Sequence, residues 1–496
     1  MKKTIQKVVW HFEPFSFVMV MGTGIASDIL YSFPYPARWL RICSYILFAI
    51  ACLLFIFLQL FACIHMFWYA RRYSWHRYFN HYYRNLMHNV FWGTYPMGLV
   101  TIINYLTNLT ETPSIISENN AKRLMIFIYL LWWYDITISM LTAWGISFLI
   151  WQDYYYTEDW ANKYPVGTDR QKIATQNLKS TLLMNVIPLV VGTASGALFT
   201  MTNIFTITFN RNIQLLTMVI CILLWLHAIL FVGILVTLFF WNLYVNKLPK
   251  MQQVFTMFLV LGPLGQGAFG ILLMTNNIKT YVDLYYPAIT SIQAPKGSET
   301  ALLTLLIPWC FKIFGLITSL ALLGMGYFFT IITFVAIFSY LPVKEESTTP
   351  TTNKKITMLT FHKGFWAMTF PMGTMALGTN EVWKQYGQFV PIGAFRVVAA
   401  IYSVLCVVWV IVCLMGSIYT KCIPYLKHQW NRQHRHSQNE VCDEESLRKD
   451  EDDDQLDSMG SANEIDGSDD NASEATIGIR ESDSVIELAT MATRTQ

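Results

Sequence analysis

The sequence predicts an all-α polytopic membrane protein with ten spanning helices, built as five helical hairpins whose first helices surround a central pathway. Three observations predict this fold. Hydrophobic residues make up 54% of the 496 residues and charged residues only 14%, against roughly 25% in ordinary soluble domains. Ten long apolar stretches follow one another, and they alternate between two kinds. A soluble fold has too little interior for such a composition.

The ten stretches each have the length that a spanning helix needs, about 20 mostly apolar residues. They are expected at 14–33, 39–69, 90–109, 121–151, 180–203, 213–245, 253–275, 303–341, 365–383 and 391–419. The even-numbered stretches are the longer ones and are apolar nearly all round. The odd-numbered stretches hold most of the glycines.

Four odd-numbered stretches also carry a proline near their centre: Pro96, Pro188, Pro263 and Pro371. A proline removes a helical hydrogen bond, and in lipid this is tolerated only where the loosened backbone faces protein or water. The odd stretches are therefore predicted to line a pathway, with the prolines setting kinks. Glycine and proline are common in membrane helices for packing reasons alone, but that alternative does not explain the alternation.

The chain divides by charge into three expected parts: a cytoplasmic N-terminus at 1–12, a transport domain at 13–420 and a disordered acidic tail at 421–496. From 440 to 496 there are 18 acidic and 4 basic residues, whereas the other 439 residues hold 14 acidic and 31 basic ones. Counted by side of the membrane, 21 loop Lys and Arg residues fall on one side and 9 on the other. The positive-inside rule then places both termini in the cytoplasm.

The predicted pathway carries almost no charge, because the central parts of the odd stretches contain no Lys, Arg, Asp or Glu. Cation pathways usually show acidic rings and strong anion sites basic ones, so a neutral corridor suits a weakly held small anion. The candidate lining and contact residues are Gly22, Thr23, Thr94, Gly98, Gly265, Gln266, Thr369, Gly373 and Thr374. The alternative is that the threonine hydroxyls only satisfy neighbouring backbone carbonyls.

Ionisable residues inside the membrane stand on even-numbered stretches: His65, Asp135, His227 and Lys312. Such residues are costly in lipid and usually have a partner. A structural ion pair between Asp135 and Lys312 is preferred over a proton-coupling role, and His227 is expected to bond to a neighbouring carbonyl. The sequence shows no nucleophile motif, phosphate loop or metal cluster, so no enzyme activity, cofactor or metal is indicated.

Three phrases resemble one transport family: FEPFSFVMVMGTGIASDILYSFPYPARWLR, FWGTYPMGLVTIINYL and FHKGFWAMTFPMGT. They are similar to the tellurite-resistance/dicarboxylate transporter family, and more narrowly to its fungal sulfite-efflux branch. The resemblance runs from about residue 10 to 419. It implies a quasi-five-fold ring of hairpins around a central pore, commonly in a trimer. In that family a phenylalanine on the ninth helix plugs the pore, and the matching position here is Phe370.

The resemblance implies efflux of sulfite or bisulfite across the plasma membrane, giving sulfite tolerance. Within transport, the alternative is a dicarboxylate (malate) transporter or a less selective anion channel. From another class, the chain could be a membrane receptor that signals through its acidic tail. The sequence leaves open sulfite against bisulfite, channel against proton-coupled carrier, and the oligomeric state.

Overall fold

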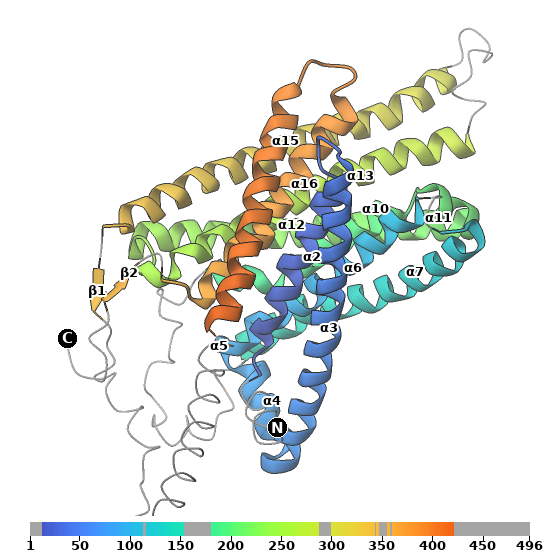
Figure 1. The fold of residues 1–496 in the computed structure, drawn as a ribbon. Helices are drawn as coiled ribbons and strands as arrows, with labels where there is room; N and C mark the ends of the chain where they lie inside the picture. The colour runs from blue at the N-terminus through green and yellow to red at the C-terminus, as the bar shows by residue number, and fades with distance from the viewer. Residues whose placement is uncertain are drawn as a thin grey trace, which may run out of the picture. The chain divides into compact units, whose positions relative to one another are not determined.

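The computed structural model describes residues 12–112, 116–152, 180–286, 299–342, 344–346, 355–357 and 360–420. They belong to one unit of the chain, Met1–Lys421, and almost all of them are helical (Figure 1). The predicted N-terminal segment 1–12, except Phe12, and the predicted tail 421–496 lie outside the described residues. Both assignments stay predictions.

Five helices share one construction, in which an α-helix follows directly on a 3-10 segment. The pairs are Pro14–Phe17 with α2 (Val18–Tyr31), Val90–Gly93 with α6 (Thr94–Thr110), Ser180–Asn185 with α10 (Ile187–Phe199), Met251–Val260 with α13 (Leu261–Tyr285), and Lys363–Met368 with α16 (Thr369–Tyr386). These five, named the inner helices below, fall on the odd-numbered predicted stretches.

The four predicted mid-span prolines stand at the junction between the two parts of four inner helices, α6, α10, α13 and α16. Pro188 is the second residue of α10, and Pro96, Pro263 and Pro371 are the third residues of α6, α13 and α16. A proline in the first turn of an α-helix costs little, because its missing N–H would have no partner there. The change from 3-10 to α-helix therefore occurs where the sequence removes a backbone donor.

The remaining long helices are more exposed. They are α3 (Arg38–Tyr73), α7 (Glu118–Met140), α12 (Arg211–Asn246), α15 (Glu299–Tyr340) and the helix Gly393–Thr420. Helix α7 continues through a π-helical segment, Leu141–Ile146, into α8 (Ser147–Gln152). In the most apolar window of α3 only 11% of residues are buried, against 94% for Met251–Tyr285. These helices, named the outer helices, present apolar side chains outward.

Seven described helices are long and apolar enough to cross a membrane. The other three predicted spans, 90–109, 180–203 and 365–383, are helical but fall short of that standard. Their α-helices are short: α6 has 17 residues, α10 has 13 and α16 has 18. The reason differs among them: α10 is apolar but short, whereas α6 and α16 carry polar residues such as Asn104, Asn108, Asn380 and Glu381.

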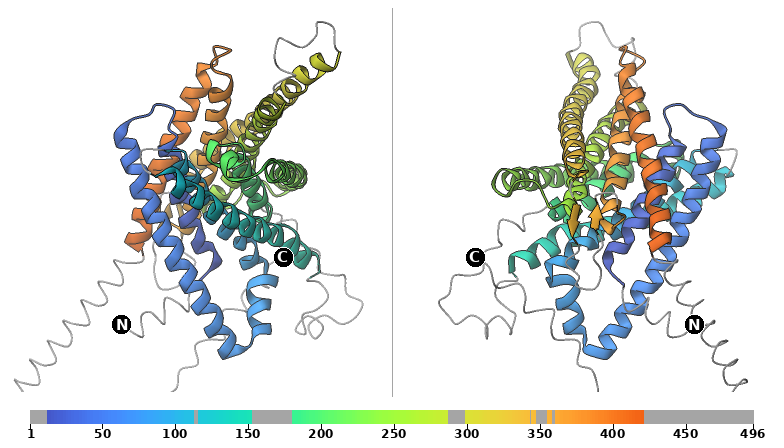
Figure 2. Two further views of the ribbon diagram at one scale, coloured as in Figure 1. Left: turned by 90° about the vertical axis from the view of Figure 1, so that its right-hand side faces the viewer. Right: turned by 60° about the vertical axis from the view of Figure 1, so that its left-hand side comes forward.

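The inner helices pack against one another in cyclic order: α2 on α6, α6 on α10, α10 on α13, α13 on α16, and α16 on α2 (Figures 1 and 2). The outer helices α3, α7, α12 and α15 each pack on the inner helix that precedes them in the chain. The helix Gly393–Thr420 contacts the preceding inner helix through Cys406 at Thr369 and Trp409 at Phe365. The 3-10 segments also contact one another in sequence order. All five inner helices therefore run in the same direction.

Glycine lets inner helices approach closely where a Cβ atom would meet the backbone of a neighbour, as at Gly93 beside Met184 and at Gly265. A Cβ atom built on Gly265 would lie 2.6 Å from the backbone nitrogen of Met375 and from the carbonyl carbon of Thr374. No side chain fits there, so Gly265 sets the distance between α13 and α16. By contrast, a Cβ on Gly98 would lie at an ordinary 3.4 Å from Val20.

Shorter elements connect these helices. They are α4 (Trp75–Phe79), a π-helical turn (Asn80–Arg84), α5 (Leu86–Asn89), α11 (Asn203–Thr208), and an antiparallel strand pair, β1 (Lys344–Glu346) with β2 (Lys355–Thr357).

Candidate functional site

Phe370 is the second residue of α16 and is 3% exposed. Contacts define the sides of this helix: Gly373 faces α2, Gly378 faces α13, and Thr379 bonds to a tyrosine of α15. At 100° per residue, Phe370 lies about 60° from Gly373, between the α2 and α13 sides and opposite the α15 side. It therefore faces the other inner helices and not α15; this side of an inner helix, turned away from the outer helices, is named the enclosed side below.

Gln266 lies on the side of α13 that corresponds to the side of α16 where Phe370 stands. Gly265 faces α16, Gly270 faces α10, and Gly267 faces the outer helices α12 and α15. Gln266 lies about 100° round from Gly265 and 100° from Gly267. It is therefore on the enclosed side, whereas the predicted lining residue Gly265 points to the neighbouring inner helix.

On α2, Gly22 faces α16 and Gly24 faces α6. Going round α13 or α16 in the direction of increasing residue number, one meets first the side that faces the next inner helix, then the enclosed side, then the side that faces the previous inner helix. Because the inner helices are parallel, the same order holds for α2. That order places Asp28 on the enclosed side. The predicted contact residue Thr23 falls on the opposite side of the helix.

The threonine hydroxyls proposed as anion contacts all donate to backbone carbonyls. Thr23 donates to Met19 at 2.7 Å. The other three donate to a carbonyl three residues earlier at 2.7–2.8 Å: Thr94 to Phe91, Thr369 to Trp366 and Thr374 to Pro371. A hydroxyl has one hydrogen, so in this conformation these groups have none left for an anion.

Other polar groups on the inner helices are buried with no hydrogen-bond partner in the part of the chain that the structure describes. There is at least one on each inner helix: Asp28 Oδ1 and Oδ2, Asn104 Oδ1, Ser195 Oγ, Gln266 Oε1 and Asn380 Oδ1. Buried polar groups are normally paired with protein or water. Their polarity was visible in the sequence, but their lack of partners depends on tertiary packing and was not.

The ion pair predicted between Asp135 and Lys312 does not form, and that prediction is wrong. The Lys312 ammonium donates to Asn276 Oδ1 at 3.1 Å and lies 5.2 Å from the Tyr386 ring centre. Asp135 stands on α7, fully buried, with one oxygen 3.5 Å from the Ser139 hydroxyl. The two residues belong to different hairpins, which sequence spacing cannot reveal.

The expected partner of His227 was also wrong. The Trp144 indole N–H donates to His227 Nε2 at 2.9 Å. That nitrogen therefore accepts from the continuation of α7, and no hydrogen bond between His227 and a backbone carbonyl is present among the described residues.

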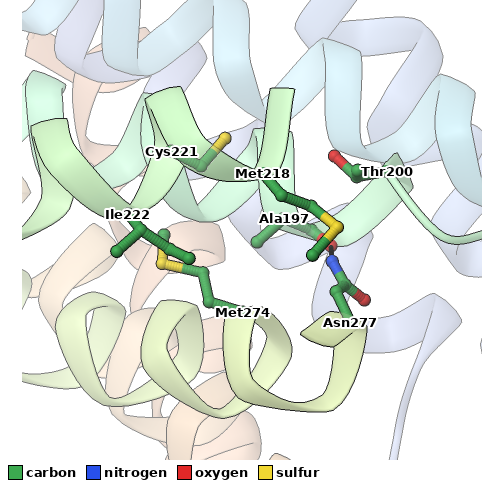
Figure 3. Close-up of a pocket in the computed structure, with 7 residues that line it drawn as sticks. All are labelled: Ala197, Thr200, Met218, Cys221, Ile222, Met274 and Asn277. Carbon is green, nitrogen blue, oxygen red and sulfur yellow. Dashed lines mark hydrogen bonds between the residues drawn. The ribbon is translucent and has the colours of Figure 1, made fainter. Parts of the chain in front are cut away.

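A small pocket lies apart from these residues, between α10, α12 and α13 (Figure 3). Its walls are apolar except for Thr200 and Asn277, and the Asn277 amide donates to the Ala197 carbonyl at 2.6 Å. It contains none of the predicted site residues.

The family model described as a voltage-dependent anion channel, SLAC1, matches residues 11–418. The chain belongs to this anion-channel family. It is 56% identical over 408 residues to the sulfite efflux pump SSU1 of Saccharomyces cerevisiae, covering 82% of this chain and 87% of that protein. It is 28% identical over 419 residues to the Candida albicans SSU1, covering 84% and 75%, and 24% identical over 420 residues to that of Arthroderma otae, covering 84% and 92%.

The family match begins before the first described helix and ends within the last one, Gly393–Thr420. The family and these relatives are channels and transporters rather than enzymes. The sequence-based resemblance is therefore confirmed, as is membership of a class of membrane transport proteins that move anions.

Proposed function

We propose that this SLAC1-family protein exports sulfite, as sulfite or bisulfite, from the cell through the space enclosed by its five inner helices. The observation that carries the proposal is the 56% identity to a sulfite efflux pump over 87% of that protein's length. The enclosed side of α16 and α13 supports it. Phe370 and Gln266 stand there and neither is charged.

The proposed architecture is ten spanning helices in five hairpins around a quasi-five-fold axis, with a central pore. Two features support it: the 3-10/α construction repeated in five helices, and their closed cyclic packing order. Plasma-membrane location, cytoplasmic termini and assembly as a homotrimer are parts of the same proposal. They rest on the loop charges and on the family resemblance.

Phe370 is the proposed gate. Its ring is buried on the enclosed side of α16, at the junction where the 3-10 segment ends. The Trp366 carbonyl, one turn before, accepts from Thr369, and Cys406 Sγ lies 3.3 Å from the Thr369 carbonyl. These contacts fix the backbone next to the ring, so opening is expected to move the ring rather than the helix.

The driving force for export needs no built-in pump chemistry. A membrane potential that is negative inside favours anion exit by about 2.3 kcal/mol per charge per 100 mV. Lack of charge around Phe370 fits an anion that must leave as easily as it enters. The path conducts, and the potential sets the direction.

The test is sulfite appearing outside sulfite-loaded cells of a sulfite-sensitive yeast that expresses this chain. Wild type is compared with Phe370→Ala, with malate and nitrate as competing anions and surface protein measured for each. The proposal expects sulfite export by wild type and faster, less selective export by Phe370→Ala. A less selective channel, which the family description also allows, would carry nitrate as well as sulfite in the wild type. Malate or nitrate moving without sulfite would contradict the cargo.

A further inference from the structure

Asp28 is a carboxyl group deep in the proposed path that lacks any visible partner. It is 4% exposed, and both carboxyl oxygens are buried without a hydrogen bond from the described residues. It stands on the enclosed side of α2. Asp28 is six positions after Gly22, and Gly22 lies beside Thr369, the first residue of α16. At 1.5 Å per residue, Asp28 is therefore about 9 Å further along the path than the start of α16.

The neighbouring titratable and charged groups all have other contacts. Tyr31, on the same helix, shares a 2.6 Å hydrogen bond with Thr112, and Arg41 of α3 lies 4.7 Å from the Tyr31 ring centre. On α6 the Tyr105 hydroxyl pairs with Ser44 at 2.9 Å. On α16, Glu381 accepts from Gln385 at 2.8 Å. At the far end of α2, Glu13 and Lys363 pair with each other at 2.6 Å. None of these groups is bonded to Asp28.

A buried carboxylate with neither donors nor a cation loses its hydration without compensation. The site therefore accommodates the neutral acid, which has one O–H to donate. On α6, the inner helix that packs next to α2, Asn104 also leaves its side-chain oxygen unpartnered. A passing oxyanion accepts hydrogen bonds and is repelled by negative charge, so the two states of Asp28 affect it in opposite ways.

We propose that Asp28 is a protonatable residue of the anion path, resting on the proposed export function. As the acid it donates a hydrogen bond to the passing sulfite or bisulfite ion. As the carboxylate, after releasing its proton to water on the outer side, it repels the ion and closes the path. Flux is then controlled by pH at Asp28 in addition to the gate at Phe370.

The experiment uses the full chain in liposomes loaded with sulfite, with external pH varied in steps. The quantity measured is the ratio of wild-type flux to Asp28→Asn flux at each pH, because the anion's own protonation cancels in that ratio. The proposal expects a ratio that falls as pH rises, by up to about tenfold per pH unit once the acid form is the minor one. The ratio of Asp28→Glu flux to Asp28→Asn flux is also expected to fall as the pH rises.

The matched control is Asp283→Asn, which removes an exposed carboxylate paired with Lys279; its ratio to wild type is expected to be flat. Asp28→Ser supplies a second neutral side chain in case the asparagine variant does not fold. A ratio that stays constant with pH while both proteins carry sulfite overturns the proposal. So does a folded Asp28→Asn protein that is inactive at every pH. If no variant carries sulfite, the export proposal has failed, and the same ratio measured with nitrate still tests Asp28.

Discussion

Replacing Gly265 by alanine tests how closely the inner helices α13 and α16 pack. A Cβ atom there would lie 2.6 Å from Met375 N and Thr374 C and 2.8 Å from Thr374 O, all of them backbone atoms. Because no side chain can rotate away, α13 and α16 must move apart by up to about 1 Å. Overpacking of this kind costs about 1–3 kcal/mol. The better helix propensity of alanine returns at most about 1 kcal/mol.

The expected net loss for Gly265→Ala is thus about 1–2 kcal/mol, seen as a lower apparent melting temperature of the detergent-solubilised protein. Two glycine-to-alanine variants serve as controls. At Gly98 the new Cβ makes an ordinary 3.4 Å contact with Val20, and at Gly233, on outer helix α12, it meets nothing within 4 Å. Both are expected to melt at or slightly above wild type. If Gly265→Ala melts with the controls, the close approach of α13 and α16 is wrong.

Two further predictions concern groups outside the proposed path. Burial, with the nearby His88 and then His65, lowers the pKa of His81 from its usual 6.5, and the His88 ring lies 4.8 Å away. Below about pH 6.5 the unfolded chain therefore binds more protons than the folded one, so the stability that His81 contributes is complete above that pH and declines as the pH falls toward the lowered pKa. The variant His81→Gln should therefore show a smaller fall in melting temperature between pH 7.5 and 5.5 than wild type. An equally steep fall in the variant would refute this prediction. The variant Asn276→Leu removes the acceptor of the buried Lys312 ammonium and should lower the free energy of unfolding by about 1–3 kcal/mol. Adding Lys312→Met to the same chain should restore much of that loss. Losses that simply add in the double variant would refute the contact.

Much of the fold was predictable because the membrane imposes strong rules on sequence. The length of apolar stretches, the prolines Pro96, Pro263 and Pro371, and the alternating exposure they imply all follow from the cost of unsatisfied backbone in lipid. Helix ends were also close: the expected 303–341 corresponds to α15 at Glu299–Tyr340. The 3-10 segments were not predicted, because local composition does not distinguish a tightened helix from an α-helix.

The roles given to the candidate site residues stay predictions, and their orientation could not be predicted. Phe370 and Gln266 lie on the enclosed side, whereas Thr23 faces away and Gly265 faces a neighbouring helix. Which side of a helix faces inward depends on contacts between segments far apart in the chain, such as Gly22 with Thr369. The same dependence explains the Asp135 and Lys312 error. A buried ion pair requires both groups at one interface, and sequence alone gave no register between hairpins.

The measurement that tests the central claim most directly is sulfite flux through the purified chain in liposomes with an imposed potential. Wild type and Phe370→Ala are reconstituted at equal density, and sulfite, nitrate and malate are followed separately. The account predicts sulfite movement in the direction that the potential favours, and a larger flux with weaker discrimination in Phe370→Ala. Correctly assembled wild-type protein that passes no sulfite, or a Phe370→Ala protein indistinguishable from it, would contradict the cargo in the first case and the gate in the second.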